Sequence, residues 1–457
     1  MSMLKVDIDL VRKYNVPGPR YTSYPPATQF SDELSRENLV EKIRENGSSS
    51  RDLSLYFHLP FCQSLCWFCG CTTVITTDQN KSGDYIKYLE REMDLMKALI
   101  NPGRKVVQLH FGGGTPTFSL PDEIRRLGAA IRSRFQFAPD IEAGVEVDPR
   151  RLTRDHLQAL REVGFNRTSM GVQDNEPVVQ KAIHRIQPFE MTAQSVEWMR
   201  ELGFQSINID LIYGLPYQTP VTFAKTLDET LSLKPDRFAV FNYAHVPWLK
   251  PAQNALKPEV LPSPETKLEL LKLTIEKLTS EGYVYIGMDH FAKANDELAV
   301  AQQQKSLQRN FQGYSTRGWA DIYAFGMSSI SQIEELYWQN EKTLPEYYTA
   351  LDAGRLPLHR GYLMTPEDKI RRTTIMRLMC DLGLDYAAMS SLLGVNFKQH
   401  FAAELESLDD MEADGLVVKT PQSLIVTDLG RLLIRNIAMR FDAYASNRKE
   451  KRFSKTI

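Results

Sequence analysis

Leu53-Ser-Leu-Tyr-Phe-His-Leu-Pro-Phe-Cys62-Gln-Ser-Leu-Cys66-Trp-Phe-Cys69-Gly-Cys71 joins a short apolar run to a loop that holds four of the chain's five cysteines. Thiolates this close together bind a metal, carry out redox chemistry or form disulfides. The N-terminus lacks the apolar stretch of a secretory signal, which argues against disulfides. Zinc sites usually add a second cysteine pair or histidines at ligand spacing, and the sequence offers no such set.

The spacing C-x3-C-x2-C suits three corners of a cubane iron–sulfur cluster whose fourth iron is open to a ligand that is not protein. We therefore expect Cys62, Cys66 and Cys69 to ligate a [4Fe-4S] cluster. Cys71 is expected to be a neighbour of the cluster rather than a ligand. Cys380 lies in an apolar helical pattern and is expected in the core.

Short apolar runs alternate with amphipathic helical patterns from Leu53 onward, which predicts parallel strands joined by right-handed crossovers. The predicted strands are Leu53–His58, Val106–Phe111, Glu142–Val147, Asn166–Val172, Ser206–Ile212 and Arg237–Asn242. The predicted helices between them include Tyr85–Ile100, Asp155–Val163, Met191–Leu202 and Phe223–Leu233. Six units are too few to close an eight-stranded barrel. We therefore expect an α/β fold, an open six-unit (β/α) partial TIM barrel.

In such folds chemistry gathers at the carboxyl ends of the strands. The cysteine loop follows the first predicted strand, and Gly112-Gly-Gly-Thr-Pro116 follows the second. Glu146, Gln173 and Asp210 lie at or near the ends of the next three. These residues are therefore predicted to share one rim.

Three parts are expected along the chain: an N-terminal arm (1–50), a barrel with an extension (51–345), and a mostly helical, winged-helix-like lid domain (346–457). The arm is predicted to be irregular because Pro17–Pro26 holds too many prolines for a helix. Beyond the barrel we expect a helix at Lys267–Ser280 and a strand at Tyr283–Met288, while residues 293–345 show a mixed pattern. In the last part we expect helices at Glu404–Leu416 and Asp428–Tyr444 around a hairpin at Val417–Val426. Packing or covering the barrel is favoured there over binding nucleic acid, because its arginines form no stripe.

The net charge of −2 gives no reason to expect nucleic acid or an anionic membrane as a partner. No apolar run approaches the roughly 18 residues of a membrane-spanning helix. We therefore expect a cytoplasmic enzyme.

An open cluster iron can be chelated by the amino and carboxylate groups of S-adenosylmethionine. The glycine run fits this idea, because glycines at a strand end let backbone N–H groups approach a ligand closely. Glu146 and Asp210 are acids within apolar strand runs, where a carboxylate is costly unless it is paired. Ribose hydroxyls or an amino group would pair them, and a structural hydrogen bond is the alternative for each.

The cluster motif, the Gly-Gly-Gly-Thr-Pro run and the strand order resemble the radical S-adenosylmethionine superfamily. Five further stretches resemble the oxygen-independent coproporphyrinogen III oxidase family within it, together with the extra cysteine Cys71. They are Pro19-Arg-Tyr-Thr-Ser-Tyr-Pro25, Val145-Glu-Val-Asp-Pro149, Phe241-Asn-Tyr-Ala-His245, Gly287-Met-Asp-His-Phe291 and the terminal Phe453-Ser-Lys. The likeness covers nearly the whole chain.

This resemblance implies oxidative decarboxylation of two propionates of coproporphyrinogen III to vinyls, giving protoporphyrinogen IX, by a 5′-deoxyadenosyl radical. It implies that Tyr56, Gly113 and Glu146 contact the cluster-bound S-adenosylmethionine. It also implies a second S-adenosylmethionine, with two further residues lining the cofactor region. Around that second molecule would lie Phe68, Gly114, Thr115, Gln173, Arg185 and Asp210, and the lining residues would be Ala244 and Ile330. Cys71 and Tyr56 are the candidate catalytic residues.

The substrate's propionates should meet basic groups, and Arg20 in the arm is the first candidate. His58, His245 and His290 are further candidates, although a core histidine is the commoner outcome. We expect a monomer that receives electrons from a donor such as flavodoxin or ferredoxin.

Three alternatives remain open at this point. The first is a heme-binding, chaperone-like relative, although such relatives lack the extra cysteine and the Arg-Tyr-Thr-Ser-Tyr arm. The second is a radical heme-processing methyltransferase that uses two S-adenosylmethionines. The third is a simple iron–sulfur electron carrier, which has no need of a large barrel or an open iron.

Overall fold

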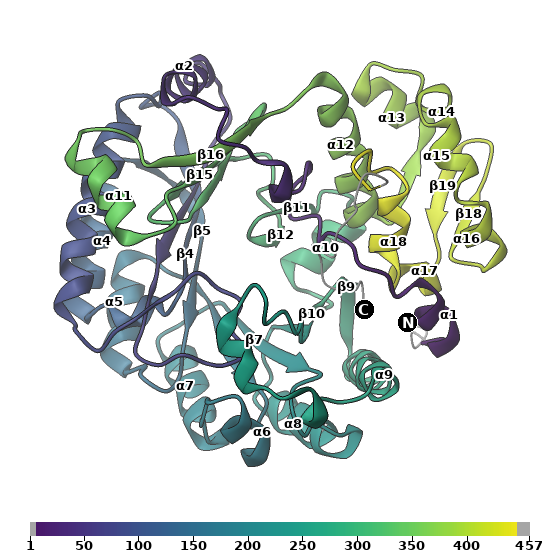
Figure 1. Cartoon of the computed structure of the whole chain (residues 1–457), viewed down its shortest axis with the longest axis horizontal. Helices are drawn as coiled ribbons and strands as arrows, with labels where there is room; N and C mark the ends of the chain where they lie inside the picture. Colours follow the sequence, from purple (N-terminus) through teal and green to yellow (C-terminus); the bar gives the residue numbers. More distant parts are fainter. Residues whose placement is uncertain (1–5, 446–457) are drawn as a thin grey trace.

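The computed structural model describes residues 6–445 (Figure 1). A curved twelve-stranded sheet organises most of the chain, in the order β16-β15-β14-β13-β1-β4-β5-β6-β7-β8-β10-β9. Its six central strands run parallel and lie where they were predicted. They are β1 (Leu53–Leu59), β4 (Lys105–Gly113), β5 (Gln136–Val147), β6 (Arg167–Gln173), β7 (Ser206–Tyr213) and β8 (Arg237–Asn242). The predicted partial TIM barrel is confirmed.

Helices cover the outer face of these strands (Figure 1). They are α3 (Asn80–Lys97), α4 (Pro121–Arg132), α5 (Arg154–Val163), α6 (Pro177–Ala182), α7 (Phe189–Glu201) and α8 (Pro220–Ser232). In α5, the Thr153 hydroxyl accepts a hydrogen bond from the His156 amide, and the helix ends at Gly164 with φ +108°. Its buried face, which includes Leu157 and Leu160, packs into the main apolar core.

Further strands extend both edges of the sheet. Beside β1 lie β13 (Asp321–Phe325), which is parallel to it, and then antiparallel β14 (Ile330–Gln332), β15 (Leu336–Asn340) and β16 (Leu358–Leu363). Beside β8 lie β10 (His290–Lys293) and β9 (Tyr283–Gly287). Strand β9 and helix α9 (Pro264–Ser280) agree with prediction. Most strands after residue 290 are only three to five residues long, too short to show a periodic pattern.

Between these strands, α10 (Glu297–Gln303) and a hairpin of β11 (Gln308–Asn310) and β12 (Gly313–Ser315) lie beside the barrel, and α11 (Leu344–Asp352) precedes β16. Two two-residue strands, β2 (Phe61–Cys62) and β3 (Val74–Ile75), pair in parallel across the base of the cysteine loop.

The N-terminal arm is not irregular throughout, so that prediction was wrong in part. It contains α1 (Ile8–Tyr14) and the eleven-residue α2 (Arg36–Asn46). Leu39 and Ile43 of α2 are buried in the main core, an i,i+4 spacing that the many prolines nearby obscured. The proline-rich segment runs between barrel and C-terminal elements (Figure 1).

The C-terminal elements have a separate apolar core, to which Tyr21 and Tyr24 of the arm contribute. Their helices are α12 (Pro366–Asp381), α13 (Tyr386–Leu393), α14 (Phe397–His400), α15 (Ala402–Glu406), α16 (Asp409–Ala413), α17 (Asp428–Arg431) and α18 (Ile434–Met439). Their strands form a three-stranded sheet in the order β17 (Gly383–Asp385), β19 (Ser423–Val426) and β18 (Val417–Lys419). The predicted hairpin is present. Each of the two long predicted helices is instead a pair of short ones. The terminal Phe453-Ser-Lys lies outside the described residues.

Among residues 6–445, no helix is both long and apolar enough to cross a membrane.

Candidate active site

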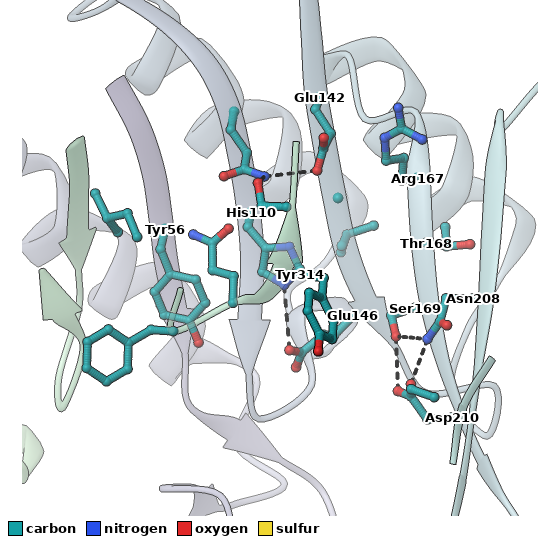
Figure 2. Close-up of a pocket in the computed structure, with 18 of the residues that line it drawn as sticks. Tyr56, His110, Glu142, Glu146, Arg167, Thr168, Ser169, Asn208, Asp210 and Tyr314 are labelled. Carbon is teal, nitrogen blue, oxygen red and sulfur yellow. Dashed lines mark hydrogen bonds and ion pairs between the residues drawn. The ribbon is translucent and has the colours of Figure 1, made fainter. Parts of the chain in front are cut away.

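The barrel encloses a cavity of about 530 Å³, lined by residues of β1, β4 to β8, β10 and the segment 311–339. Tyr56, Glu146, Asp210 and Ile330 all line it, so four of the predicted site residues come together here. Figure 2 shows how Glu146 faces His110, and how Ser169, Asn208 and Asp210 form a triangle.

The cysteine loop is tied back to the barrel by backbone hydrogen bonds. The amide of Val74 donates to the Pro60 carbonyl (2.8 Å) and that of Thr76 to the Cys62 carbonyl (2.9 Å). All five cysteines are free thiols, so none is used in a disulfide. Cys380 is buried in the core, as predicted. The loop therefore has a fixed base with its thiols available.

Polar partners surround two of the proposed ligands. Cys62 Sγ lies 3.4 Å from the Thr115 hydroxyl, beside a second cavity of about 350 Å³. The buried Cys66 Sγ accepts from Arg150 Nη2 (3.4 Å) and from Arg185 Nη1 (3.6 Å). Two positively charged donors therefore contact the sulfur of one proposed ligand.

Cys69 and Cys71 are hydrogen-bonded to each other. The Cys71 amide donates to Cys69 Sγ (3.4 Å). A hydrogen bond from the Cys71 thiol lowers the pKa of Cys69 to about 6, and the same bond raises the pKa of Cys71 well above its ordinary value. Cys71 thus lies next to Cys69 as a donor, at an exposed position of the loop.

The glycine run packs directly against the loop. Gly113 has φ +112°, and a Cβ there would lie 2.5 Å from the His58 ring. A Cβ on Gly114 would lie 2.5 Å from the Pro60 carbonyl oxygen. The amides of Gly114 and Thr115 donate to the carbonyls of Leu59 and Phe61, each at 2.9 Å. Only glycine fits these two positions.

Glu146 is held ionised. Its Oε2 accepts from the Gly113 amide (3.1 Å), and its Oε1 lies 3.6 Å from His110 Nε2. Burial raises its pKa, but the hydrogen bonds from His110 and Gly113 outweigh burial and leave the pKa below its ordinary value. The side chain is still 43% exposed, facing the cavity. It presents a carboxylate to whatever binds beside the glycine run.

The pKa of Asp210 is shifted in the opposite direction to that of Glu146. Asp210 accepts hydrogen bonds from Ser169 Oγ (3.0 Å) and Asn208 Nδ2 (2.7 Å), both neutral donors. Burial raises its pKa to about 7, and the negative charge of Glu146 adds to this effect. Two cavity acids with pKa values moved in opposite directions can serve different roles.

Gln173 is the last residue of β6, and Arg185 follows helix α6. Arg185 donates to Asp148 Oδ2 (3.1 Å) and to the Gly171 carbonyl (2.6 Å), while its buried Nε has no partner. Gln173 is buried with φ +70°, a strained conformation for a residue with a side chain. Neither lines the larger cavity. Arg185 instead faces the cysteine loop through Cys66.

The other cofactor candidates are spread around the rim. Tyr56 stacks on His110 (ring centroids 5.8 Å apart), and its hydroxyl lies 3.3 Å from His58 Nδ1. Phe68 packs in a small apolar cluster, and its carbonyl accepts from Gln253 (3.0 Å). Ala244 is half-buried after β8 and does not line the larger cavity.

The basic candidates for substrate binding differ in their placement. Arg20 pairs with Asp289 and lies over the Phe241 ring at 5.6 Å, beside the cavity wall but outside its lining. His58 and His290 line the cavity. His245 lies elsewhere, with Nδ1 3.0 Å from the Tyr243 hydroxyl.

Sequence reasoning missed several polar residues of this region. His110 was hidden inside an apolar strand pattern, although it lies beside Tyr56 in register and supports Glu146. Arg150 was also missed. Its place directly after the Val-Glu-Val-Asp-Pro stretch was the available signal.

Two family descriptions match this chain: the radical SAM superfamily over residues 56–230 and the HemN C-terminal domain over residues 364–433. The oxygen-independent coproporphyrinogen III oxidases of Helicobacter pylori strain J99 and Escherichia coli K12 are each 46% identical to it, with both chains fully covered. The solved structure of coproporphyrinogen III oxidase (HemN) from Escherichia coli, described as a radical SAM enzyme, superposes with a TM-score of 0.92. That structure is 45% identical, and the match covers 97% of this chain and 100% of that one. The chain therefore belongs to the oxygen-independent coproporphyrinogen III oxidase family of the radical SAM superfamily.

Proposed function

We propose that this protein oxidatively decarboxylates two propionates of coproporphyrinogen III to vinyls, giving protoporphyrinogen IX without oxygen. Full-length likeness to the family's oxidases carries this proposal. It favours the oxidase over a heme chaperone, a methyltransferase or an electron carrier.

Membership of the superfamily implies a [4Fe-4S] cluster and S-adenosylmethionine. The donor set of the cysteine loop fits a cluster, because Cys62, Cys66 and Cys69 are free thiols of one loop and Cys66 accepts hydrogen bonds from two guanidiniums. A cubane needs thiolates spread over separate irons. Cys62, Cys66 and Cys69 would hold it, with Cys71 beside Cys69. When bound, the reduced cluster and S-adenosylmethionine supply the 5′-deoxyadenosyl radical that removes a hydrogen atom from the substrate.

The chain's own residues would bind, orient and shield. Glu146, already ionised and facing the cavity, is suited to the amino group or ribose of S-adenosylmethionine beside Gly113. Tyr56 and Ile330 would contact the cofactor in the same cavity, which both of them line. Gly114, Thr115, Gln173, Arg185, Asp210, Phe68 and Ala244 remain candidates for a second S-adenosylmethionine. Of these, Asp210 faces the cavity, and Arg185 and Thr115 contact the cysteines.

We further propose that the arm and the residues from 346 onward form a cover over a barrel unit of residues 51–345. The separate apolar core that Tyr21 and Tyr24 share with the elements from α12 onward supports such a cover, while α2 and β16 pack with the barrel. We propose a cytoplasmic monomer that accepts electrons from flavodoxin or ferredoxin. Five free thiols suit a reducing compartment.

One assay tests the reaction. The cluster is reconstituted anaerobically, and S-adenosylmethionine, reductant and coproporphyrinogen III are added. Release of CO2 with formation of protoporphyrinogen IX is expected. Formation of 5′-deoxyadenosine without either product would refute the oxidase function and indicate a different radical enzyme.

A further inference from the structure

One wall of the larger cavity is formed by aromatic side chains backed by arginines. Phe241, His290 and Tyr314 line it, and the His290 ring meets the other two edge-on at centroid distances of 6.1 and 5.5 Å. Behind this layer, Arg20 lies over Phe241 (5.6 Å) and Arg309 over Tyr314 (4.7 Å). Arg309 and Tyr314 are direct cross-strand partners in the β11–β12 hairpin, so both side chains lie on one face of it.

The positive charge of Arg309 is buried and has no carboxylate partner among the described residues. Only 6% of the residue is exposed. Its Nε and Nη2 donate to the Arg20 carbonyl (3.4 and 3.2 Å), and its buried Nη1 has no partner at all. The nearby acid Asp289 is already paired with Arg20. Burying an unpaired charge is costly, so proteins rarely retain one without use.

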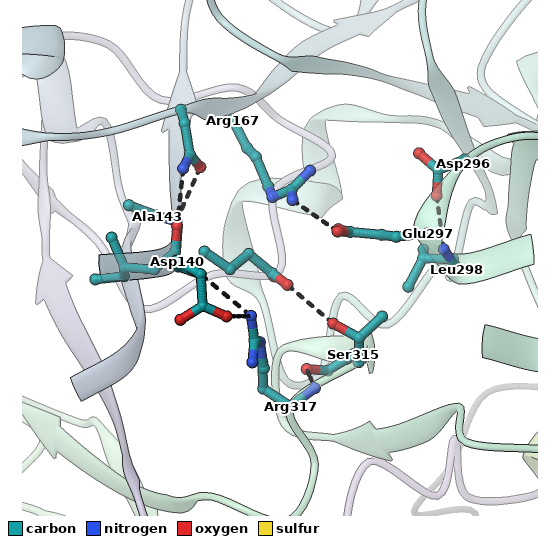
Figure 3. A network of polar contacts seen from close by, with 12 residues as sticks. Asp140, Ala143, Arg167, Asp296, Glu297, Leu298, Ser315 and Arg317 are labelled. Carbon is teal, nitrogen blue, oxygen red and sulfur yellow. Dashed lines mark hydrogen bonds and ion pairs between the residues drawn. The ribbon is translucent and has the colours of Figure 1, made fainter. Parts of the chain in front are cut away.

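Two other arginines of the cavity show the ordinary arrangement. Arg167 pairs with Glu297 at 2.7 Å (Figure 3), and Arg237 pairs with Glu297 (2.7 Å) and Asp296 (2.8 Å). These two guanidiniums are neutralised within the protein. Arg309 is therefore distinguished from them by its missing anion rather than by its burial.

His290 adds a second observation that points to a ligand. Its Nδ1 is buried without a partner although the ring faces the cavity. Burial, together with repulsion from Arg309, Arg20 and Arg237, lowers its pKa to about 3, so the ring is neutral and carries a single N–H. Gln312, in the turn of the same hairpin, also lines the cavity with a buried Nε2 that has no partner. This wall offers donors and positive charge without a matching acceptor.

We propose that this wall is a carboxylate subsite, in which His290 contacts the carboxylate and Arg309, with Arg20 beside it, supplies the compensating charge. The inference rests on the proposed function, under which two ligands carry carboxylates: the propionates of coproporphyrinogen III and the methionine part of S-adenosylmethionine. The propionate is the expected occupant. The amino-acid end of a cluster-bound S-adenosylmethionine belongs at the cysteine loop, whereas Arg309 lies in the hairpin beside β10.

The test uses the reconstituted holoenzyme and three probes under anaerobic conditions. Coproporphyrin III binding is followed by fluorescence, coproporphyrin III tetramethyl ester serves as the uncharged analogue, and S-adenosylmethionine binding is measured by equilibrium dialysis. Arg309→Gln should weaken coproporphyrin III binding about tenfold or more, because the buried positive charge that balances the carboxylate is lost. Binding of the ester and of S-adenosylmethionine should not change.

Two variants guard against a folding defect. Arg309→Lys keeps the charge and should bind coproporphyrin III within about threefold of the parent. His290→Phe keeps the edge-on packing, removes the donor, and should reproduce the loss. Arg317→Gln is the matched control, because Arg317 follows the same hairpin but pairs with Asp140 and lies outside the cavity lining (Figure 3).

Each outcome decides a separate point. Loss of S-adenosylmethionine binding instead of porphyrin binding would keep the carboxylate subsite and assign it to that ligand. Unchanged binding of both in Arg309→Gln and in His290→Phe would overturn the subsite while leaving the oxidase intact. A parent enzyme that neither binds coproporphyrin III nor forms protoporphyrinogen IX would instead overturn the proposed function, and the propionate assignment with it.

Discussion

The rim at the cysteine loop, with Cys66 and Glu146, and the aromatic wall of Phe241, His290 and Tyr314 differ in how completely their polar groups are matched. At the rim, Cys66 receives two guanidiniums that share Asp148, and Glu146 receives an amide and an imidazole. Among these rim residues one buried nitrogen, Arg185 Nε, has no partner, whereas at the wall Arg309, His290 and Gln312 each have one. The rim is arranged before any ligand arrives, whereas the wall lacks an anion that a ligand would supply.

This difference follows from how the two regions are built. The rim comes from the ends of neighbouring parallel strands, whose register brings donors and acceptors to fixed positions. The wall joins β10 and a short hairpin to the arm, which is distant from both in sequence. Each prediction below tests whether the rim is as complete as its contacts indicate.

The largest effect is expected from the cysteines. Cys66→Ala should abolish the visible absorbance of the cluster and lower product formation by about a thousandfold or more, because the radical cannot form without the cluster. Cys71→Ala should keep the iron content and the absorbance, since Cys71 is placed beside Cys69 as a donor. Iron analysis and absorbance after reconstitution measure both. A Cys71→Ala protein without iron would place Cys71 among the ligands and break the assignment.

Glu146 should give the next effect. Glu146→Gln removes the carboxylate that faces the cavity beside Gly113 and should weaken S-adenosylmethionine binding by about ten- to a hundredfold. Glu142→Gln is the matched control, since Glu142 lies four residues earlier on β5 and also lines the cavity but bonds to Gln108. Equilibrium dialysis measures both. Equal losses in the two variants would mean that charge in the cavity matters rather than the Glu146 position.

These two tests concern the residues that the sequence made visible. The cysteine spacing and the strand–helix alternation were sufficient for the barrel and its rim, because parallel strands repeat a strong local pattern. Glu146 stood out as an acid in an apolar strand run, and in the structure its carboxylate accepts a hydrogen bond from the Gly113 amide.

The wall was not predictable in the same way. Arg309 lies in a three-residue strand within a segment that showed only a mixed pattern, and its missing partner is a property of tertiary packing. Arg20 was chosen from the arm for its charge, but the sequence could not show that Asp289 pairs with it. Helix α2 was missed for a related reason, since its apolar face is revealed only by the core that it covers.

Arg150 offers a smaller test of the rim. Its guanidinium donates to Cys66 Sγ and is clamped by Asp148 at 2.6 Å. A positive donor on a ligand sulfur stabilises the reduced, more negative cluster. Arg150→Gln should therefore lower the cluster's reduction potential by about 60 mV, a tenfold change in the one-electron equilibrium. Arg151→Gln, at the exposed neighbouring position, should not. A redox titration monitored by electron paramagnetic resonance measures the potentials of the parent, Arg150→Gln and Arg151→Gln. Equal potentials for all three would show that Arg150 does not affect the reduction potential of the cluster.

The smallest effect is expected at Asp210, a rim carboxyl group whose hydrogen-bond donors, Ser169 and Asn208, are both neutral. Burial, followed by the charge of Glu146, raises its pKa from 3.8 to about 7. Between these values the unfolded chain has released the proton that the folded protein keeps, so stability falls as the pH rises through this range and levels off above it. Asparagine does not ionise. Its Oδ1 can still accept from Asn208, and its Nδ2 can donate to the Ser169 hydroxyl in place of the bond that Asp210 accepts. Asp210→Asn should therefore raise the free energy of unfolding of the cluster-free protein by about 1 kcal/mol at pH 8, and by less at pH 5.5. Urea unfolding at the two pH values measures the gain. A gain that is the same at both values, or a loss at pH 8, would show that Asp210 is as well paired as Glu146 and that the rim is complete without a ligand.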